Sequence, residues 1–249
     1  MICKNCENDF EGKFCNNCGQ SSEVRKIDFK YLADELANSV FQINRGLFFT
    51  IKELFLKPGV TVREFLEGKR QRHSKPLAFL LLTSTLYVLG LLLVGKNTYH
   101  GELMEGVLSG FDRPEDASVI ISFFHWLAKN HAYAMLLFLP VFSLASFWVF
   151  FRSEYNYLEH LILNVYITGE QSMIYLVGSL CVLVFDNYIM QLLPALVGIG
   201  YNFWAFKQFF KGGNAFTRML LTVLTYSLFI ILVGTGIFLV GMITVFLNS

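Results

Sequence analysis

Residues 77–95, LAFLLLTSTLYVLGLLLVG, decide the fold class of this chain. The stretch holds 19 residues and no charge. A helix of that length is roughly 28 Å long, about the thickness of the hydrocarbon core of a bilayer. The stretch therefore predicts a transmembrane helix.

Four further apolar stretches follow, at about 132–151, 161–185, 188–206 and 219–247. Glu170 and Gln171 interrupt the second of these four, which makes it the weakest candidate. We interpret the apolar segment 114–131 as an interfacial helix or an extension of the neighbouring span. The sequence predicts an all-α integral membrane helical bundle of about five transmembrane helices over residues 77–249.

Composition supports this class. Hydrophobic residues make up 54% of the chain and charged residues 16%, and the mean hydropathy is +0.49. Soluble domains carry about 25% charged residues. Residues 1–76 hold 13 of the 20 Lys and Arg and 10 of the 19 Asp and Glu. The first third is thus expected to face water, and the remainder to face lipid.

Loop charges predict the orientation. Segment 69–75 has four basic residues and no acid, and loop 207–218 has three basic residues and no acid, whereas loop 96–131 has three basic and five acidic residues. Basic loops stay on the cytosolic side. We expect a multi-pass protein of the inner (plasma) membrane with a cytosolic N-terminus, no secretory signal peptide, and an outside C-terminus. The basic residues near the first span either set this topology or contact anionic lipid; they are Lys69, Arg70, Arg72 and Lys75.

Residues 1–20 contain a cysteine module with the spacing Cys3-x2-Cys6-x8-Cys15-x2-Cys18. Two C-x2-C knuckles supply four thiolates to one tetrahedral ion, which is typical of a zinc ribbon. Twenty residues cannot bury a core, so bound metal would provide the folding energy. We predict a structural Zn2+. Two disulfides are disfavoured by a reducing cytosol, and an iron–sulfur centre is a minor alternative with the same ligand count.

The charge of the module argues against nucleic acid as a partner. Residues 1–20 contain two basic and three acidic side chains. A phosphate-binding surface would be basic. We therefore expect the ribbon to dock a cytosolic or membrane protein partner or to act as a spacer.

Residues 21–76 are predicted to form a cytosolic linker followed by amphipathic juxtamembrane helices. Apolar residues recur at helical spacing after Asp28, a candidate N-cap. The pair at 58–59, PG, is expected to stop this pattern. Thr61 and Glu64 have the spacing of a capping box that opens a short helix, and Gly68 is expected to end it.

This order of parts resembles the bacterial membrane family known as domain of unknown function 3667. The similar segments are 58–70 (PGVTVREFLEGKR), 75–84 (KPLAFLLLTS) and 157–161 (YLEHL), together with the N-terminal two-knuckle ribbon. The resemblance implies a bacterial inner-membrane protein. It implies no activity.

Three ionisable residues, Glu159, His160 and Glu170, form a possible intramembrane polar site. A carboxylate–imidazole set could relay protons or bind a cation. For Glu159 and His160 we favour the simpler interpretation that they face water at the cytosolic interface. We expect Glu170 to face the bundle interior, with Asn202 among its candidate partners.

The sequence favours a non-enzymatic role, because it contains none of the common hydrolase, metalloprotease or nucleotide-binding motifs. Our leading hypothesis is a membrane scaffold or sensor whose zinc ribbon docks a protein partner. A small transporter or channel that uses Glu170, and a membrane enzyme acting on lipid, remain as alternatives.

Overall fold

The computed structural model describes residues 1–23, 27–31, 46–94, 126, 131–184 and 188–248. Over these residues the secondary structure is helical, apart from two isolated β-bridges near the N-terminus, Ile2 with Asp9 and Phe14 with Ser21. The helices are α2 (Leu47–Leu56), α3 (Pro58–Glu67), α4 (Pro76–Val94), α7 (His131–Val149), α8 (Tyr157–Val184), α9 (Tyr188–Phe209) and α10 (Ala215–Asn248). The all-α prediction is confirmed for this part of the chain.

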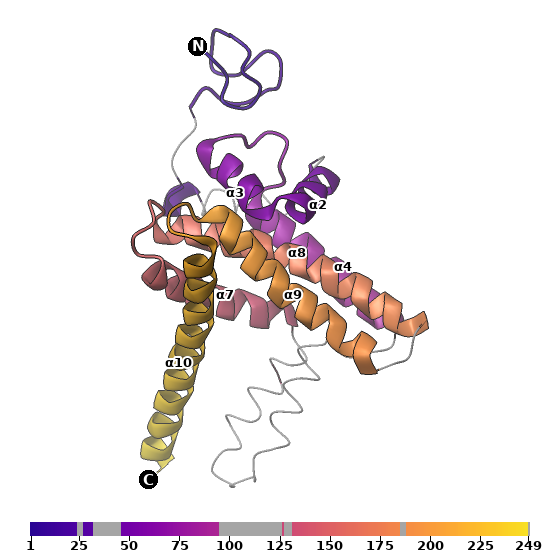
Figure 1. Ribbon diagram of the computed structural model, residues 1–249, viewed down its shortest axis with the longest axis vertical. Coiled ribbons are helices and arrows are strands. Elements are labelled where there is room, and N and C mark those ends of the chain that lie inside the picture. Colours follow the sequence, from indigo (N-terminus) through magenta and orange to yellow (C-terminus); the bar gives the residue numbers. More distant parts are fainter. Residues whose placement is uncertain (24–26, 32–45, 95–125, 127–130, 185–187, 249) are drawn as a thin grey trace.

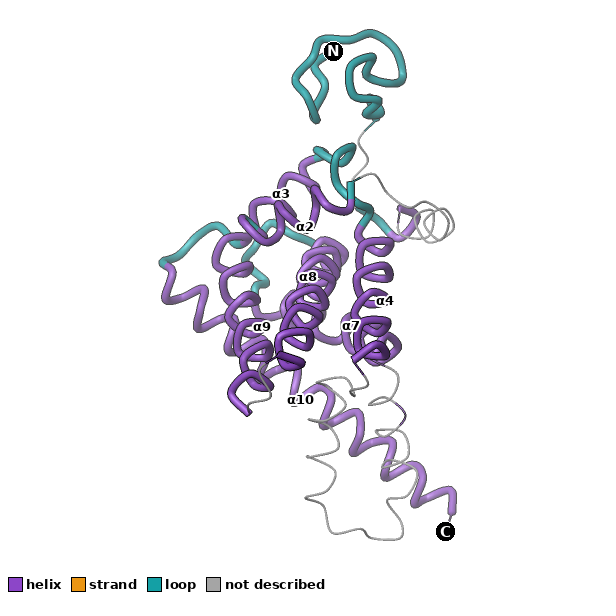
Figure 2. Tube along the Cα trace, turned by 90° about the vertical axis from the view of Figure 1, so that its right-hand side faces the viewer, coloured by secondary structure: helices purple, strands orange, loops and turns teal. Residues whose placement is uncertain are grey.

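Each of the five apolar stretches forms one long helix, α4, α7, α8, α9 and α10. Helix α8 continues without a break through Glu170 and Gln171. It lies at the centre of the bundle and packs against α4, α7 and α9 (Figure 2). The predicted interfacial helix at 114–131 lies outside the described residues, except at Trp126 and His131.

Contacts between the helices fix their directions. Helix α7 is antiparallel to α8 and to α10, and α8 is antiparallel to α9. The contacting pairs that show this are Ser146–His160 and Leu139–Val165 (α7 and α8), Gln171–Gly198 and Gly178–Pro194 (α8 and α9), and Phe142–Tyr226 and Phe138–Phe229 (α7 and α10). Helices α4 and α8 run parallel, because Phe79 meets Tyr166 and Tyr87 meets Tyr175. Successive long helices therefore alternate in direction, and the C-terminus lies at the end opposite the N-terminal module (Figure 1).

Helices α2 and α3 and the following loop form a structure that we call the collar, residues 46–75. The chain breaks after Leu56 as predicted, but Pro58 opens α3 at its first position instead of ending a helix. Thr61 consequently lies inside α3, where its hydroxyl donates to the Lys57 carbonyl at 2.9 Å. The predicted capping box is therefore wrong. Gly68 ends α3 with φ 115°, as its position suggested.

The collar is fastened to α8 and α9. The Tyr201 hydroxyl donates to the Leu54 carbonyl at 3.1 Å, and the Tyr166 hydroxyl donates to the Ser74 carbonyl at 2.6 Å. Gly59 lies so close to α9 that a Cβ there would fall 2.3 Å from the backbone nitrogen of Phe209. These contacts join the collar and the bundle into one core.

The N-terminal module is tethered to this core. Ile27 is only 3% exposed and packs in the same hydrophobic cluster as Leu54 and Phe65. Asp28 caps the turn that follows, because the Tyr31 amide donates to its carboxylate at 2.7 Å. The continuation of that predicted helix, 32–45, lies outside the described residues.

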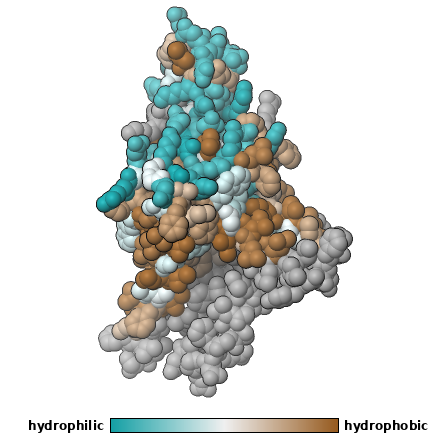
Figure 3. All heavy atoms as spheres, in the orientation of Figure 1, coloured by the Kyte–Doolittle hydropathy of each residue, from teal (hydrophilic) through white to brown (hydrophobic). Residues whose placement is uncertain are grey.

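Hydropathy divides the molecule along its long axis, with hydrophilic residues over the N-terminal module and collar and hydrophobic residues over the helices below (Figure 3). Among the described residues, Ala215–Val240 is long and apolar enough to cross a membrane. Only 6% of its most apolar 18 residues are buried. Pro76–Leu92 and Leu136–Val149 are shorter apolar helices.

Candidate metal centre and buried polar sites

The structure brings Cys3, Cys6, Cys15 and Cys18 together. All four are free thiols, and their sulfur atoms lie within 4.8 Å of one another. The closest pairs, Cys3 with Cys18 and Cys6 with Cys15, are both 3.6 Å apart. A tetrahedral ion with bonds of about 2.3 Å would hold sulfurs about 3.8 Å apart. The four cysteines could therefore bind one metal ion.

The two knuckles are repeats of one another, offset by twelve residues. The Cys3 amide donates to the Asn8 carbonyl at 2.9 Å, and the Cys15 amide donates to the Gln20 carbonyl at 2.8 Å. The β-bridges at Ile2 and Phe14 are related by the same offset. Each knuckle thus presents its two thiols through the same backbone path.

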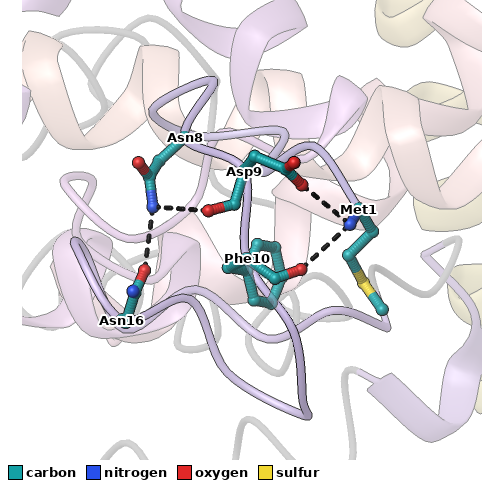
Figure 4. A network of polar contacts seen from close by, with 5 residues as sticks. All are labelled: Met1, Asn8, Asp9, Phe10 and Asn16. Atoms are coloured by element: carbon teal, nitrogen blue, oxygen red, sulfur yellow. Dashed lines mark hydrogen bonds and ion pairs between the residues drawn. The ribbon is translucent and has the colours of Figure 1, made fainter.

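A polar network holds the knuckles together (Figure 4). Asn8 donates to the Asn16 side chain at 2.8 Å and to the Asp9 carbonyl at 3.1 Å. The Met1 ammonium donates to the Asp9 carboxylate at 3.0 Å and to the Phe10 carbonyl at 2.9 Å. That ammonium holds the pKa of Asp9 below its ordinary value. The network fixes the fold of the module outside its ligand positions.

The surroundings of Cys15 favour its thiolate. Burial of the thiol raises its pKa, whereas backbone hydrogen bonds from Cys18 and Asn17 lower it. The neighbouring Cys6 and Cys3 thiols lower it further, and the resulting pKa of Cys15 is about 6. In the same knuckle, burial raises the pKa of Cys18 to about 11, so the thiols differ and a bound metal ion would have to displace protons from the cluster.

His160 is fully buried, so the expectation that it faces water is wrong. Its ring lies between Phe147 and Phe210, with centroids 5.7 and 5.3 Å away. Its Nδ1 lies 2.9 Å from the Ser146 hydroxyl, and its Nε2 lies 3.3 Å from the Ser153 hydroxyl. Both ring nitrogens therefore have partners at the junction of α7 and α8.

Serine hydroxyls surround His160. The Ser146 hydroxyl lies 2.9 Å from the Ser143 carbonyl and 2.9 Å from His160 Nδ1. The donor and acceptor roles at the two ring nitrogens follow the tautomer. Asn164 lies one helical turn from His160 and donates to Ser143 and Ser146. The arrangement is that of a neutral, satisfied core histidine.

Glu159 is half-buried and does not meet His160 or Glu170. Its carboxylate accepts from the Asn156 amide at 2.9 Å, and its own amide donates to the Asn156 side chain at 3.0 Å. This reciprocal pair is a capping box that begins α8. Glu159 thus has a local structural role.

Glu170 is 1% exposed and faces the bundle interior. Its Oε2 atom is buried and meets no donor in the described part of the chain. Asn202, the partner we expected, makes no hydrogen bond to it, and its own Oδ1 is buried without a partner. The structure therefore separates Glu170 from the other two members of the predicted polar site.

The four basic collar residues differ in their surroundings. Lys69 pairs with Glu64 at 3.1 Å. Arg70 donates to the Phe65 carbonyl and lies over the rings of Phe65 and Tyr31. Lys75 is half-buried and Arg72 is exposed. Arg72 is thus the one exposed side chain of these four.

Sequence reasoning missed three groups that the structure makes important: the serines around His160, Tyr201, and Arg63. Arg63 donates to the Gln208 and Phe209 carbonyls at the end of α9. The signal for the serines was present, since Ser143 and Ser146 are spaced for one face of an otherwise apolar helix.

Residues 44–88 match the family described as Protein of unknown function (DUF3667). The resemblance to this family is thereby confirmed over α2, α3 and most of α4. No curated protein and no solved structure matches the chain.

Proposed function

We propose that this chain is a five-span inner-membrane protein with a structural zinc ribbon at its cytosolic end, and that it acts as a non-enzymatic scaffold or sensor. The proposed spans are α4, α7, α8, α9 and α10. The N-terminus would lie in the cytosol and the C-terminus outside.

An inverted distribution of side chains supports the membrane assignment. Large apolar side chains are exposed on the long helices, including Leu92, Leu196, Ile230 and Phe238. Polar side chains are buried between the same helices: Thr83, Ser143, Ser146, Asn164, Thr222 and Thr225. In water such apolar surface would be unfavourable, and lipid is the solvent that matches it.

The positions of the charges support the orientation. In the described long helices the charged side chains are Glu159, Lys207 and Arg218, which lie at the collar end, and Glu170 inside. Arg218 donates to the Phe210 carbonyl, and Phe210 packs on His160, so these ends meet at one level. A basic collar and basic helix ends on the same side agree with a cytosolic location.

The thiol cluster supports zinc. Four cysteine ligands complete a tetrahedron and leave no open position, which suits a structural ion rather than a catalytic one. Four thiolates and one divalent ion carry two negative charges in sum. The loaded ribbon would thus present an acidic surface and would not attract nucleic acid.

The observation that carries the docking role is the outer surface of the ribbon. Ile2 is 74% exposed and Phe14 is 65% exposed, at positions related by the repeat. Ile27 packs in the core cluster a few residues beyond the ribbon. We propose that a protein with an apolar patch and a basic rim docks there.

Site-specific photo-crosslinking tests this role. A photoreactive residue at Phe14 should capture one protein, whereas the same residue at Asn17, which is also exposed, should not. The paired change Ile2→Ser with Phe14→Ser should abolish co-purification of that protein and leave the zinc content unchanged. Equal crosslinking from both positions, or a partner retained by the double variant, would contradict docking at this surface.

The alternative of a lipid-modifying enzyme has no comparable support. The Ser146–His160 pair resembles a nucleophile and its base, but both side chains are fully buried. A substrate would have to part α7 from α8 to reach them.

A further inference from the structure

Glu170 occupies a core position of α8. It falls in the stripe formed by Leu163, Tyr166, Ile167 and Ile174, all of which pack in the main hydrophobic cluster. That cluster joins α8 to α9 and to the collar. Glu170 lies near the midpoint of α8, which places its carboxyl group far from either helix end.

Nearby donors are directed elsewhere. The Tyr201 hydroxyl lies close enough to Glu170 for an electrostatic interaction, yet it donates to the Leu54 carbonyl. The Gln171 amide donates to the Gly198 carbonyl at 2.8 Å. In the described ranges no Lys, Arg or His forms an ion pair with Glu170. The Oε2 atom of Glu170 therefore accepts no hydrogen bond from the described part of the chain.

A bare carboxylate in such a place would be costly. Charged groups in hydrocarbon cost at least a few kcal/mol, and buried charges are normally paired. The core of a bundle can keep an acid there when a positive charge accompanies it. Among the described residues no side chain supplies this positive charge.

We propose that Glu170 is a binding site for a single positive charge, either a proton or a monovalent metal cation, in the buried core around α8. A divalent ion is disfavoured, because it would need several oxygen ligands and Glu170 is the one carboxylate described in this core. The Tyr201–Leu54 hydrogen bond joins α9 to α2. The depth of the site rests on the proposed membrane placement of α8.

Infrared difference spectroscopy on the purified full-length protein tests this proposal. If a proton occupies the site, a carboxylic-acid C=O band should be present in the wild type and absent in Glu170→Gln. If a metal cation occupies it, the acid band should be missing, and a carboxylate band should shift when Na⁺ replaces K⁺. Glu159→Gln is the matched control on the same helix and should leave either signal in place.

A spectrum of Glu170 with no acid band and a carboxylate band insensitive to both cations would overturn the proposal. Should Glu170→Gln fail to fold, Glu170→Asp keeps the carboxyl group, and a displaced acid or carboxylate band would identify the site. The measurement is independent of orientation and of ribbon docking, so a reversed topology or a missing partner would leave its outcome readable.

Discussion

Glu7 and Gly19 occupy equivalent positions in the two cysteine knuckles, and both have positive φ, 60° and 75°. The Glu7 amide donates to the Cys3 carbonyl at 2.9 Å, and the Gly19 amide donates to the Cys15 carbonyl at 2.8 Å. Each turn needs a left-handed residue after its second cysteine. The second knuckle has the residue type that adopts this conformation freely, and the first does not.

Replacing Glu7 with glycine should therefore strengthen the metal site. A left-handed residue other than glycine costs about 1 kcal/mol, which corresponds to roughly a five-fold change in affinity. Glu7→Gly should bind zinc more tightly by that factor in a competition with a chelator.

Glu11→Gly is the matched control, since Glu11 is also exposed and has no positive φ. It should bind zinc no more tightly than the wild type. Gly19→Glu should weaken binding, and a tighter site in that variant would contradict the role assigned to the turn.

Sequence reasoning located the knuckles and the long helices because those features are local. Ligand spacing and apolar length are both visible within twenty residues. It misplaced the start of α3, expecting a capping box at Thr61 and Glu64, because a proline can end one helix and also begin the next. It failed at His160 because Ser146, its partner, lies on another helix.

A second prediction concerns the contact between the collar and α9. Gly59→Ala would place a Cβ 2.3 Å from the Phe209 nitrogen and 2.6 Å from the Ala205 carbonyl oxygen. Backbone atoms cannot yield as a flexible side chain can, so we expect a loss of about 1–3 kcal/mol or more in the free energy of unfolding. Thermal unfolding in detergent would measure it.

Gly200→Ala provides the comparison, because a Cβ at Gly200 would meet nothing within 4 Å. It should be neutral or stabilising by up to about 1 kcal/mol, as alanine favours helix. Similar melting temperatures for the two variants would contradict the described packing of α3 on α9.

A third prediction tests Arg63 as the group that satisfies the end of α9. Arg63→Met removes the donor to the Gln208 and Phe209 carbonyls and should cost about 1–3 kcal/mol. Arg63→Lys should recover only part of this, because an ammonium lacks the planar fork. Hydrogen exchange of the α3 amides measures these effects. Arg152→Met removes an exposed charge that lies over the Phe151 ring and should have little effect on this exchange. Equal exchange in all three variants would contradict the capping role.

A fourth prediction concerns pH. His73 is buried against Phe49 and Phe65, and burial lowers its pKa below the ordinary value of 6.5. Above pH 6.5 the ring is neutral in both the folded and unfolded chain, so its packing contributes fully. As the pH falls below 6.5 the unfolded chain takes up a proton that the folded chain does not, and stability declines. The melting temperature of the wild type should fall more steeply with decreasing pH than that of His73→Phe. Parallel plots of melting temperature against pH would contradict a neutral buried ring.

The proposed membrane bundle has its N-terminus and its C-terminus on opposite sides of the membrane. Alkaline phosphatase fused after Ser249 tests this directly, because the enzyme is active only outside the cytosol. Five alternating spans and a cytosolic ribbon predict an active phosphatase fusion and a dark green-fluorescent-protein fusion at the same site. An inactive phosphatase with a fluorescent counterpart would place the C-terminus in the cytosol and contradict the proposed topology.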